Sequence, residues 1–308
     1  MSDSTRRDRR GRRASRPEGN ARRRVAAATE IVVARHAGYC YGVERALRIA
    51  EEAAGKLAEP IVTLGPLIHN PVVVERLAQR GIGVVDDLSL LDRGTVIVRT
   101  HGVPPEVTAA ARERGLTVID ATCPFVSVAH QRAGALRRRR YVPLILGERD
   151  HPEVAGLLAC AGEGAIVIED AGDLAATAVR GKRVGVVVQT TQTRENLAAL
   201  VARVAPLARE MLVFNTICDA TEKRQTEAQK LARTVDVVVV VGGRNSANTT
   251  RLARLCRAIQ PRTHHVERAE ELEASWFEGA GRVGVAAGAS TPQEEIVATA
   301  ARIRELSG

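Results

Sequence analysis

The chain has 308 residues, of which 45% are hydrophobic and 26% charged, enough apolar surface for a substantial core. Aromatic residues make up only 2%, so the chain offers few of the stacking platforms with which single-strand nucleic-acid binders hold bases. The net charge of +9 is concentrated in residues 1–24, where ten arginines outnumber three carboxylates, which leaves +2 for the rest. We therefore expect no nucleic-acid partner.

The arginine-rich start is predicted to form a disordered tail over residues 1–29. The apolar stretch behind it is short and carries Glu30, so we predict no secretory signal, and no apolar run approaches the roughly 20 residues that span a bilayer. The chain is therefore expected to be soluble and cytoplasmic, with no membrane partner.

After the tail, short apolar strands alternate with amphipathic helices, a pattern typical of parallel α/β units. The valine-dense strands lack polar alternation, which indicates sheets covered by helices on both faces. We predict strands at 31–34, 61–64, 95–99, 117–119, 142–146, 165–168, 184–188, 235–241 and 282–286. We predict helices at 43–57, 71–80, 104–114, 126–139, 151–161, 194–204, 222–233, 248–259 and 293–306.

One module recurs three times along this succession. Each copy opens with a cysteine, and an apolar strand ends in a glycine 24 or 25 residues later: Cys40 and Gly65, Cys123 and Gly147, Cys218 and Gly242. A polar residue follows four positions after each glycine: His69, His151 and Ser246. We predict an α/β fold of three pseudo-repeated modules, at 30–122, 123–214 and 215–308, around a central cavity that holds a cluster.

The three repeated cysteines are better explained by metal chemistry than by disulfides. Five cysteines is an odd number, and Cys160 and Cys256 lie inside apolar helical stretches, where we expect small core residues. Cys40, Cys123 and Cys218 form no C-x-x-C pair, and a structural zinc site would need a fourth ligand. Three thiolates on a [4Fe–4S] cluster would leave one iron without a protein ligand, open to a substrate oxygen.

Polar side chains gather where strands give way to helices, which is where parallel α/β units bind ligands. We expect helix N-termini there to favour an anion, above all a phosphate, with imidazole, hydroxyl and amide groups as donors. Glu153 is the carboxylate at these turns and is predicted to be a proton source. Helix capping is an alternative role for the hydroxyl and amide residues. The donors are His69, His101, His151, Thr190, Ser246, Asn248 and Ser290, and Thr191 and Thr291 are further hydroxyls at these turns.

Nine motifs across about 260 residues carry a family resemblance. They are AGYCYGVERA at 37–46, IHNP at 68–71, RTHGV at 99–103, DATCP at 120–124, HPEVAG at 151–156, QTT at 189–191, NTICDAT at 215–221, GGRNSAN at 242–248 and AGAS at 287–290. In this order they resemble the 4-hydroxy-3-methylbut-2-enyl diphosphate reductase (LytB-type) family.

The resemblance implies reductive dehydroxylation of that allylic diphosphate, with two electrons and two protons, to isopentenyl and dimethylallyl diphosphate in isoprenoid precursor synthesis. It implies a [4Fe–4S] cluster on Cys40, Cys123 and Cys218, and electrons from a ferredoxin or flavodoxin. It also implies a proton relay from Glu153 aided by Thr190 and His151. The diphosphate would be bound by His69, His101, His151, Thr190, Ser246, Asn248 and Ser290.

One departure from the family pattern leaves alternatives open. The family usually has two serines before the asparagine, whereas this chain has Ser246, Ala247 and Asn248, so one hydroxyl donor is missing. A diverged paralogue could act on a related allylic diphosphate, and a hydratase or dehydratase could use the open iron purely as a Lewis acid. A third alternative makes the arginine-rich tail the binding element and the modules its scaffold.

Overall fold

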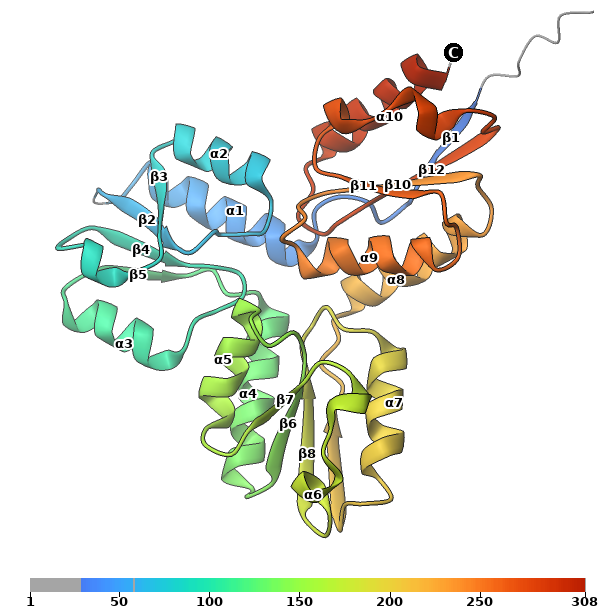
Figure 1. Ribbon diagram of the computed structural model, residues 1–308. Helices are drawn as coiled ribbons and strands as arrows, with labels where there is room; N and C mark the ends of the chain where they lie inside the picture. The colour runs from blue at the N-terminus through green and yellow to red at the C-terminus, as the bar shows by residue number, and fades with distance from the viewer. Residues whose placement is uncertain (1–28, 58, 308) are drawn as a thin grey trace, which may run out of the picture.

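The computed structural model describes residues 29–307 apart from residue 58, so the tail predicted over residues 1–29 lies almost wholly outside the described residues. The described chain forms three lobes around a common centre (Figure 1). Each lobe is a four-stranded parallel sheet with helices on both faces. The predicted α/β class with three modules is confirmed.

The first lobe has the strand order β3–β2–β4–β5. Alternate residues of its central strands face opposite helix layers, with Ile61 and Ile97 packed on the α1 side and Val62 and Val96 on the α3 side. Burial on both faces explains why these strands are apolar throughout. The elements are α1 (Tyr41–Ala54), β2 (Ile61–Leu64), α2 (Pro71–Gln79), β3 (Ile82–Val85), η1 (Leu88–Leu90), β4 (Thr95–Val98), α3 (Pro105–Glu113) and β5 (Thr117–Asp120).

The second lobe repeats this plan with the order β7–β6–β8–β9. Leu144 and Val186 face α7, whereas Ile145 and Val187 face α4 and α5. The elements are α4 (Pro124–Arg138), β6 (Val142–Leu146), α5 (Pro152–Ala161), β7 (Ile166–Ile168), η2 (Ala171–Asp173), α6 (Ala176–Val179), β8 (Arg183–Val188), α7 (Arg194–Val204) and β9 (Glu210–Phe214).

The third lobe has the order β11–β10–β12–β1. The all-valine strand β10 is fully buried, with Val239 packed on the α10 side and Val238 on the side of α8 and α9. The elements are β1 (Glu30–Val33), α8 (Asp219–Ala232), β10 (Val237–Val241), α9 (Ala247–Arg257), β11 (Thr263–Val266), η3 (Ala269–Glu271), η4 (Ala274–Phe277), β12 (Arg282–Ala287) and α10 (Gln293–Ser307).

Strand β1 lies in a different lobe from the one in which the sequence analysis placed it. Residues 30–33 were assigned to the first module, yet Glu30 pairs with Arg282 and Val33 with Val285, so the strand completes the third sheet. The outer strands β1, β5 and β9 each precede the cysteine that opens the next lobe. The first strand therefore closes the ring of lobes, and the first module begins near Cys40.

Local sequence signals explain where the helices begin. Asn70 caps α2 by accepting a hydrogen bond from the Val73 N–H at 3.2 Å, and Thr193 caps α7 by accepting one from Asn196 at 3.1 Å. Proline opens α2 and α5, where its missing N–H costs no helical hydrogen bond. Across the described residues, no helix combines the length and apolarity needed to cross a bilayer.

Candidate active site

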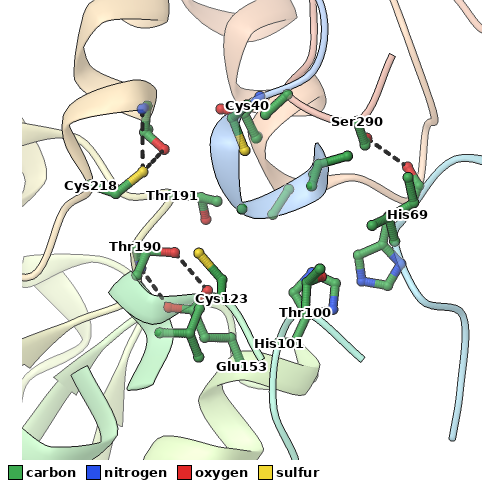
Figure 2. A pocket seen from close by; sticks show the side chains of 18 of the residues that line it. Cys40, His69, Thr100, His101, Cys123, Glu153, Thr190, Thr191, Cys218 and Ser290 are labelled. Carbon is green, nitrogen blue, oxygen red and sulfur yellow. Dashed lines mark hydrogen bonds between the residues drawn. The ribbon is translucent and has the colours of Figure 1, made fainter. Parts of the chain in front are cut away.

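All eleven residues predicted to form the site line one cavity between the three lobes (Figure 2). The cavity lies at the carboxyl ends of the central strands. Each lobe therefore contributes to its lining a cysteine and the turns that follow the strands. The eleven are Cys40, His69, His101, Cys123, His151, Glu153, Thr190, Cys218, Ser246, Asn248 and Ser290.

Each of the three cysteines is the N-cap of a helix and is anchored to the preceding lobe. Cys40, Cys123 and Cys218 cap α1, α4 and α8. Their backbone N–H groups donate to carbonyl oxygens in the turns after β12, β4 and β8: Cys40 to Ala289 at 3.1 Å, Cys123 to Thr100 at 2.9 Å and Cys218 to Thr190 at 3.1 Å. The ring of lobes thus presents three thiols in equivalent settings.

Burial of the sulfurs favours their neutral thiol forms. Burial raises the pKa of the Cys123 thiol to about 11 and also raises the pKa of Cys218. The helix N-termini oppose this through N–H groups, and the Thr221 N–H donates to Cys218 Sγ at 3.3 Å. A Cβ added at Gly42 would lie 2.6 Å from Cys123 Sγ, so the glycine keeps space open beside the sulfurs. The deprotonated forms of the three cysteines would therefore need a positive charge close to the sulfurs.

Cys160 and Cys256 lie away from this cavity. Cys256 is fully buried in the core beneath α8 and α9, and Cys160 packs on the core beside α4 and α5. Among the described residues, no other cysteine lines the cavity and Glu153 is its sole carboxylate. The thiol set that faces the cavity therefore has three members.

Three histidines form a compact cluster in the lining of the cavity. His69 stacks on His101 with ring centroids 4.4 Å apart, and His151 meets both edge-on, at 5.5 Å from His69 and 5.2 Å from His101. Burial lowers the pKa of His69 to about 4 and of His151 to about 3, and it also lowers the pKa of His101 well below its ordinary value. Arg99 adds repulsion in each case.

These pKa values change one detail of the sequence prediction. A cationic or hydrogen-bonding rim was expected, and the three imidazoles are neutral because burial and repulsion from neighbouring cationic groups disfavour their charged forms. A neutral imidazole still donates one N–H and accepts at its other nitrogen. The three histidines therefore form a hydrogen-bonding rim, and a bound anion would favour their protonated forms.

Several buried polar atoms around the cavity have no hydrogen-bond partner among the described residues. Both ring nitrogens of His69, Nδ1 of His101, both amide atoms of Asn248 and the Thr191 hydroxyl are buried and unpaired. Buried polar groups in folded proteins are nearly always hydrogen-bonded, so this concentration indicates a polar ligand. Ser290 differs because it donates to the His69 carbonyl oxygen at 3.1 Å, which ties the third lobe to the first (Figure 2).

Glu153 is held in the first turn of α5 by contacts from its own lobe. It is 1% exposed, and its carboxyl accepts hydrogen bonds from the Thr190 N–H at 2.6 Å and the Thr190 hydroxyl at 2.8 Å (Figure 2). The Glu153 N–H donates to His151 Nδ1 at 3.1 Å. Burial raises the pKa of Glu153 to about 7, with the nearby Glu148 adding to the rise and the Thr190 bonds opposing it. The carboxyl can thus release a proton near neutrality.

Thr191 was predicted as a hydroxyl at these turns but not as a site residue, although the repeat contains a signal for that role. The carbonyl acceptors Thr100, Thr190 and Ala289 occupy equivalent positions in the three lobes. The residues after them are His101, Thr191 and Ser290, and all three line the cavity. Aligning the turns on these acceptors would have placed Thr191 beside the two residues that were predicted.

The family follows from a match over most of the chain. The model of the LytB protein family matches residues 31–304. The chain belongs to this family. A 4-hydroxy-3-methylbut-2-enyl diphosphate reductase of Geobacter sulfurreducens (strain ATCC 51573 / DSM 12127 / PCA) is 50% identical over 277 residues, which are 90% of this chain and 98% of that protein. A protein of the same name from Aquifex aeolicus (strain VF5) is 44% identical, over 90% of this chain and 96% of its own.

Two solved structures of the LytB type confirm the fold. One is titled (E)-4-hydroxy-3-methyl-but-2-enyl diphosphate reductase, the terminal enzyme of the non-mevalonate pathway; it is 44% identical, with 90% of this chain and 99% of that chain covered and a TM-score of 0.65. The other, E-1-hydroxy-2-methyl-but-2-enyl-4-diphosphate reductase from Plasmodium falciparum, is 25% identical, with 87% and 86% covered and a TM-score of 0.80. The resemblance inferred from the motifs is confirmed.

Proposed function

We propose that this chain is a 4-hydroxy-3-methylbut-2-enyl diphosphate reductase, which removes the substrate hydroxyl as water and releases isopentenyl and dimethylallyl diphosphate. The balance is two electrons and two protons taken up for each water lost. One observation carries the proposal: three thiols, a set of unpaired hydrogen-bonding groups and a carboxyl with a pKa near 7 face one cavity. The name shared by relatives that match 90% of the chain supports it.

Cys40, Cys123 and Cys218 would hold a [4Fe–4S] cluster with one iron free of protein ligands. Three equivalent thiols at helix N-termini, with space kept open by Gly42, fit such a group. The cavity's lack of a fourth thiol, within the part of the chain that the structure describes, fits an open iron position. When bound, the cluster supplies electrons and a Lewis acid.

The diphosphate would be bound by groups on the first and third lobes, joined by His151 and Thr190 of the second. His69, His101 and Asn248 offer unpaired buried atoms, and the Ser246 hydroxyl accepts from the Thr249 N–H at 3.4 Å, which leaves its own hydrogen free to donate. The N-terminus of α9, which Ser246 caps, favours negative charge. A bound diphosphate would raise the histidine pKa values and convert neutral donors into charge-assisted ones.

Glu153 would supply the proton that lets the hydroxyl leave as water. Its protonated carboxyl faces the Thr190 hydroxyl at 2.8 Å, so a proton can pass to Thr190 as that hydroxyl donates its own into the cavity. The Thr190 N–H fixes the other carboxyl oxygen, and His151 Nδ1 orients the Glu153 backbone. The negative charge of a diphosphate would hold the proton on Glu153 more tightly until it is used.

The decisive experiment is anaerobic purification with assays of iron, sulfide and turnover. We expect about four iron and four sulfide per chain, and product only when a strong chemical reductant is supplied with 4-hydroxy-3-methylbut-2-enyl diphosphate. Turnover without any reductant would favour the hydratase or dehydratase alternative. Bound iron with reduction of a different allylic diphosphate only would favour the diverged paralogue, and a wild-type protein without iron would refute the proposal.

A further inference from the structure

The first turns of α1 and α4 leave apolar side chains in water beside two of the proposed cluster ligands. Tyr41 directly follows Cys40 and is 62% exposed, and Phe125, two residues after Cys123, is 41% exposed. Val128, one turn further along α4, is 45% exposed. In a chain with 2% aromatic residues, two exposed rings at these positions form an unusual surface.

These side chains belong to one surface because α1 and α4 contact each other where they begin. Arg45 of α1 donates to the carbonyl oxygen of Thr122, the residue before Cys123, at 3.1 Å. Gly42 of α1 approaches Cys123 Sγ so closely that an added Cβ would lie 2.6 Å away. We call the surface formed by the three exposed apolar residues and the nearby arginines the cysteine-edge patch: Tyr41, Arg45, Arg48, Phe125, Val128 and Arg132.

Arginines follow the apolar residues at helical spacing. Arg45 and Arg48 lie four and seven residues after Tyr41, and Arg132 lies seven after Phe125 with its guanidinium 5.0 Å from the centre of the Phe214 ring. Arg48 and Arg132 are exposed, and within the described residues neither forms an ion pair. The patch therefore has an apolar centre and a cationic rim.

The acidic groups nearby are one carboxylate within the patch and two on α8. Glu44 lines the same surface hollow as Tyr41, Arg45 and Arg48, so the patch has three arginines to one carboxylate. The third cysteine's helix, α8, carries Asp219 and Glu222 in its first turn, and Glu222 pairs with Arg194 at 2.6 Å. A partner with an acidic surface would accordingly cover α1 and α4 and avoid α8.

We propose that the cysteine-edge patch is the docking site of an acidic ferredoxin, an inference that rests on the proposed reductase function. Electron transfer weakens steeply with distance, and this surface adjoins two of the three ligands. Tyr, Phe and Arg are enriched in the centres of protein interfaces, and a small footprint is typical of transient electron-transfer pairs. Each reduced ferredoxin gives up one electron and leaves oxidised, so two encounters supply the two electrons that accompany two protons and the loss of water.

The test compares two electron sources on the cluster-loaded protein. The double variant Arg48→Glu, Arg132→Glu is assayed with reduced acidic ferredoxin and, separately, with a small chemical reductant. We expect the KM for ferredoxin to rise about tenfold, because attraction at the rim becomes repulsion. The salt dependence of that KM should weaken or reverse. Turnover with the chemical reductant should equal that of the wild type. The matched control is Arg304→Glu, an exposed arginine on α10.

The outcomes separate the docking site from the proposed function. An unchanged KM for ferredoxin in the double variant, with chemical turnover intact, would overturn the docking site alone. A rise in KM for a flavodoxin but not for a ferredoxin would overturn the choice of partner. No turnover of wild type with the chemical reductant would instead count against the reductase function. If the double variant lost iron, the single variants Arg48→Gln and Val128→Asp would carry the same comparison.

Discussion

The three lobes are alike where they hold the cysteines and unlike where they meet the rest of the cavity. Each cysteine caps a helix and donates its N–H to the equivalent carbonyl of the preceding lobe, at 2.9–3.1 Å. The turns differ: the first lobe supplies His69 and His101, the second His151, Glu153 and two threonines, the third Ser246, Asn248 and Ser290. A symmetric ring suits a compact cofactor, whereas unlike turns suit a substrate with a charged end and a reacting end.

The largest expected effect comes from replacing any one of the three cysteines that line the cavity. Changing Cys40, Cys123 or Cys218 to Ser, one at a time, should remove most of the bound iron and abolish turnover, because each thiol would be one of only three protein ligands. Iron and sulfide assays with the visible absorption spectrum measure this. Cys160→Ser is the control and should keep its iron. A single cysteine variant with full iron and activity would show that the three positions are not equivalent.

The second expected effect tests the asymmetry of the turns. Glu153→Gln should keep its iron yet lose about 10²–10⁴ in kcat, the range associated with a general acid. The amide preserves shape, since its oxygen can accept from the Thr190 N–H and its NH2 can donate to the Thr190 hydroxyl. The control is the exposed Glu163→Gln on the same lobe. Wild-type kcat in Glu153→Gln, measured by single-turnover product formation, would remove Glu153 from the proton path.

A third variant tests the diphosphate side of the cavity. Asn248→Ala removes a 5% exposed amide whose two polar atoms have no hydrogen-bond partner in the part of the chain that the structure describes. Loss of hydrogen bonds to a charged group costs about 1.5–3 kcal/mol, so we expect Kd for the substrate to rise about 10- to 100-fold with iron unchanged. Asn248→Asp should bind more weakly still, since its carboxylate repels the diphosphate. If both variants bound substrate as the wild type does, Asn248 would have no part in binding the diphosphate.

Most of the fold could be predicted because the central strands are valine-rich and buried on both faces. The strands that escaped prediction, β3, β9 and β11, all lie at sheet edges and are half-exposed. Gly83 interrupts one, Glu210 opens another, and two histidines occupy the third, so none has the long apolar run that marks a central strand. The sheet to which β1 belongs was predicted wrongly because its partner β12 lies about 250 residues away in the sequence, and local sequence patterns carry no information on such distant pairing.

The candidate site could be predicted to the level of residue type and position in the repeat. Eleven residues predicted from motifs and matched offsets line one cavity, but their charge states depend on burial that no single segment reveals. His69, His101 and His151 come from separate turns and are neutral because burial, with repulsion from neighbouring cationic groups, lowers the pKa of each. The guanidinium of Arg251 on α9 pairs with Glu148 at 2.5 Å and donates to the Thr191 carbonyl at 3.1 Å. The sequence could not predict these contacts, since both partners lie in another lobe.

The pH dependence of turnover gives a smaller, graded effect. Because the pKa of Glu153 is raised to about 7, the carboxyl is protonated below that pH and loses its proton as pH rises through it. As a proton donor it should make kcat/KM fall about tenfold per pH unit above pH 7. The decline of kcat with pH should begin at a higher pH, since a bound diphosphate would raise the pKa of Glu153 further. Neither decline should occur in Glu153→Gln, and a decline that persisted in this variant would have to come from another group.

The smallest expected effect is a gain at Ala247, where the family resemblance implies a serine. Ala247 is 7% exposed and lines the cavity at the first position of α9, between Ser246 and Asn248. A serine there would add a hydroxyl at a helix N-terminus that already favours an anion, so Ala247→Ser should tighten substrate binding by up to about tenfold. Kd from calorimetry on the cluster-loaded protein measures this, with the exposed Ala258→Ser at the other end of α9 as control. Weaker binding in Ala247→Ser would mean that the third lobe's turn is fitted to a substrate end for which the alanine is required, which is what the diverged-paralogue alternative predicts.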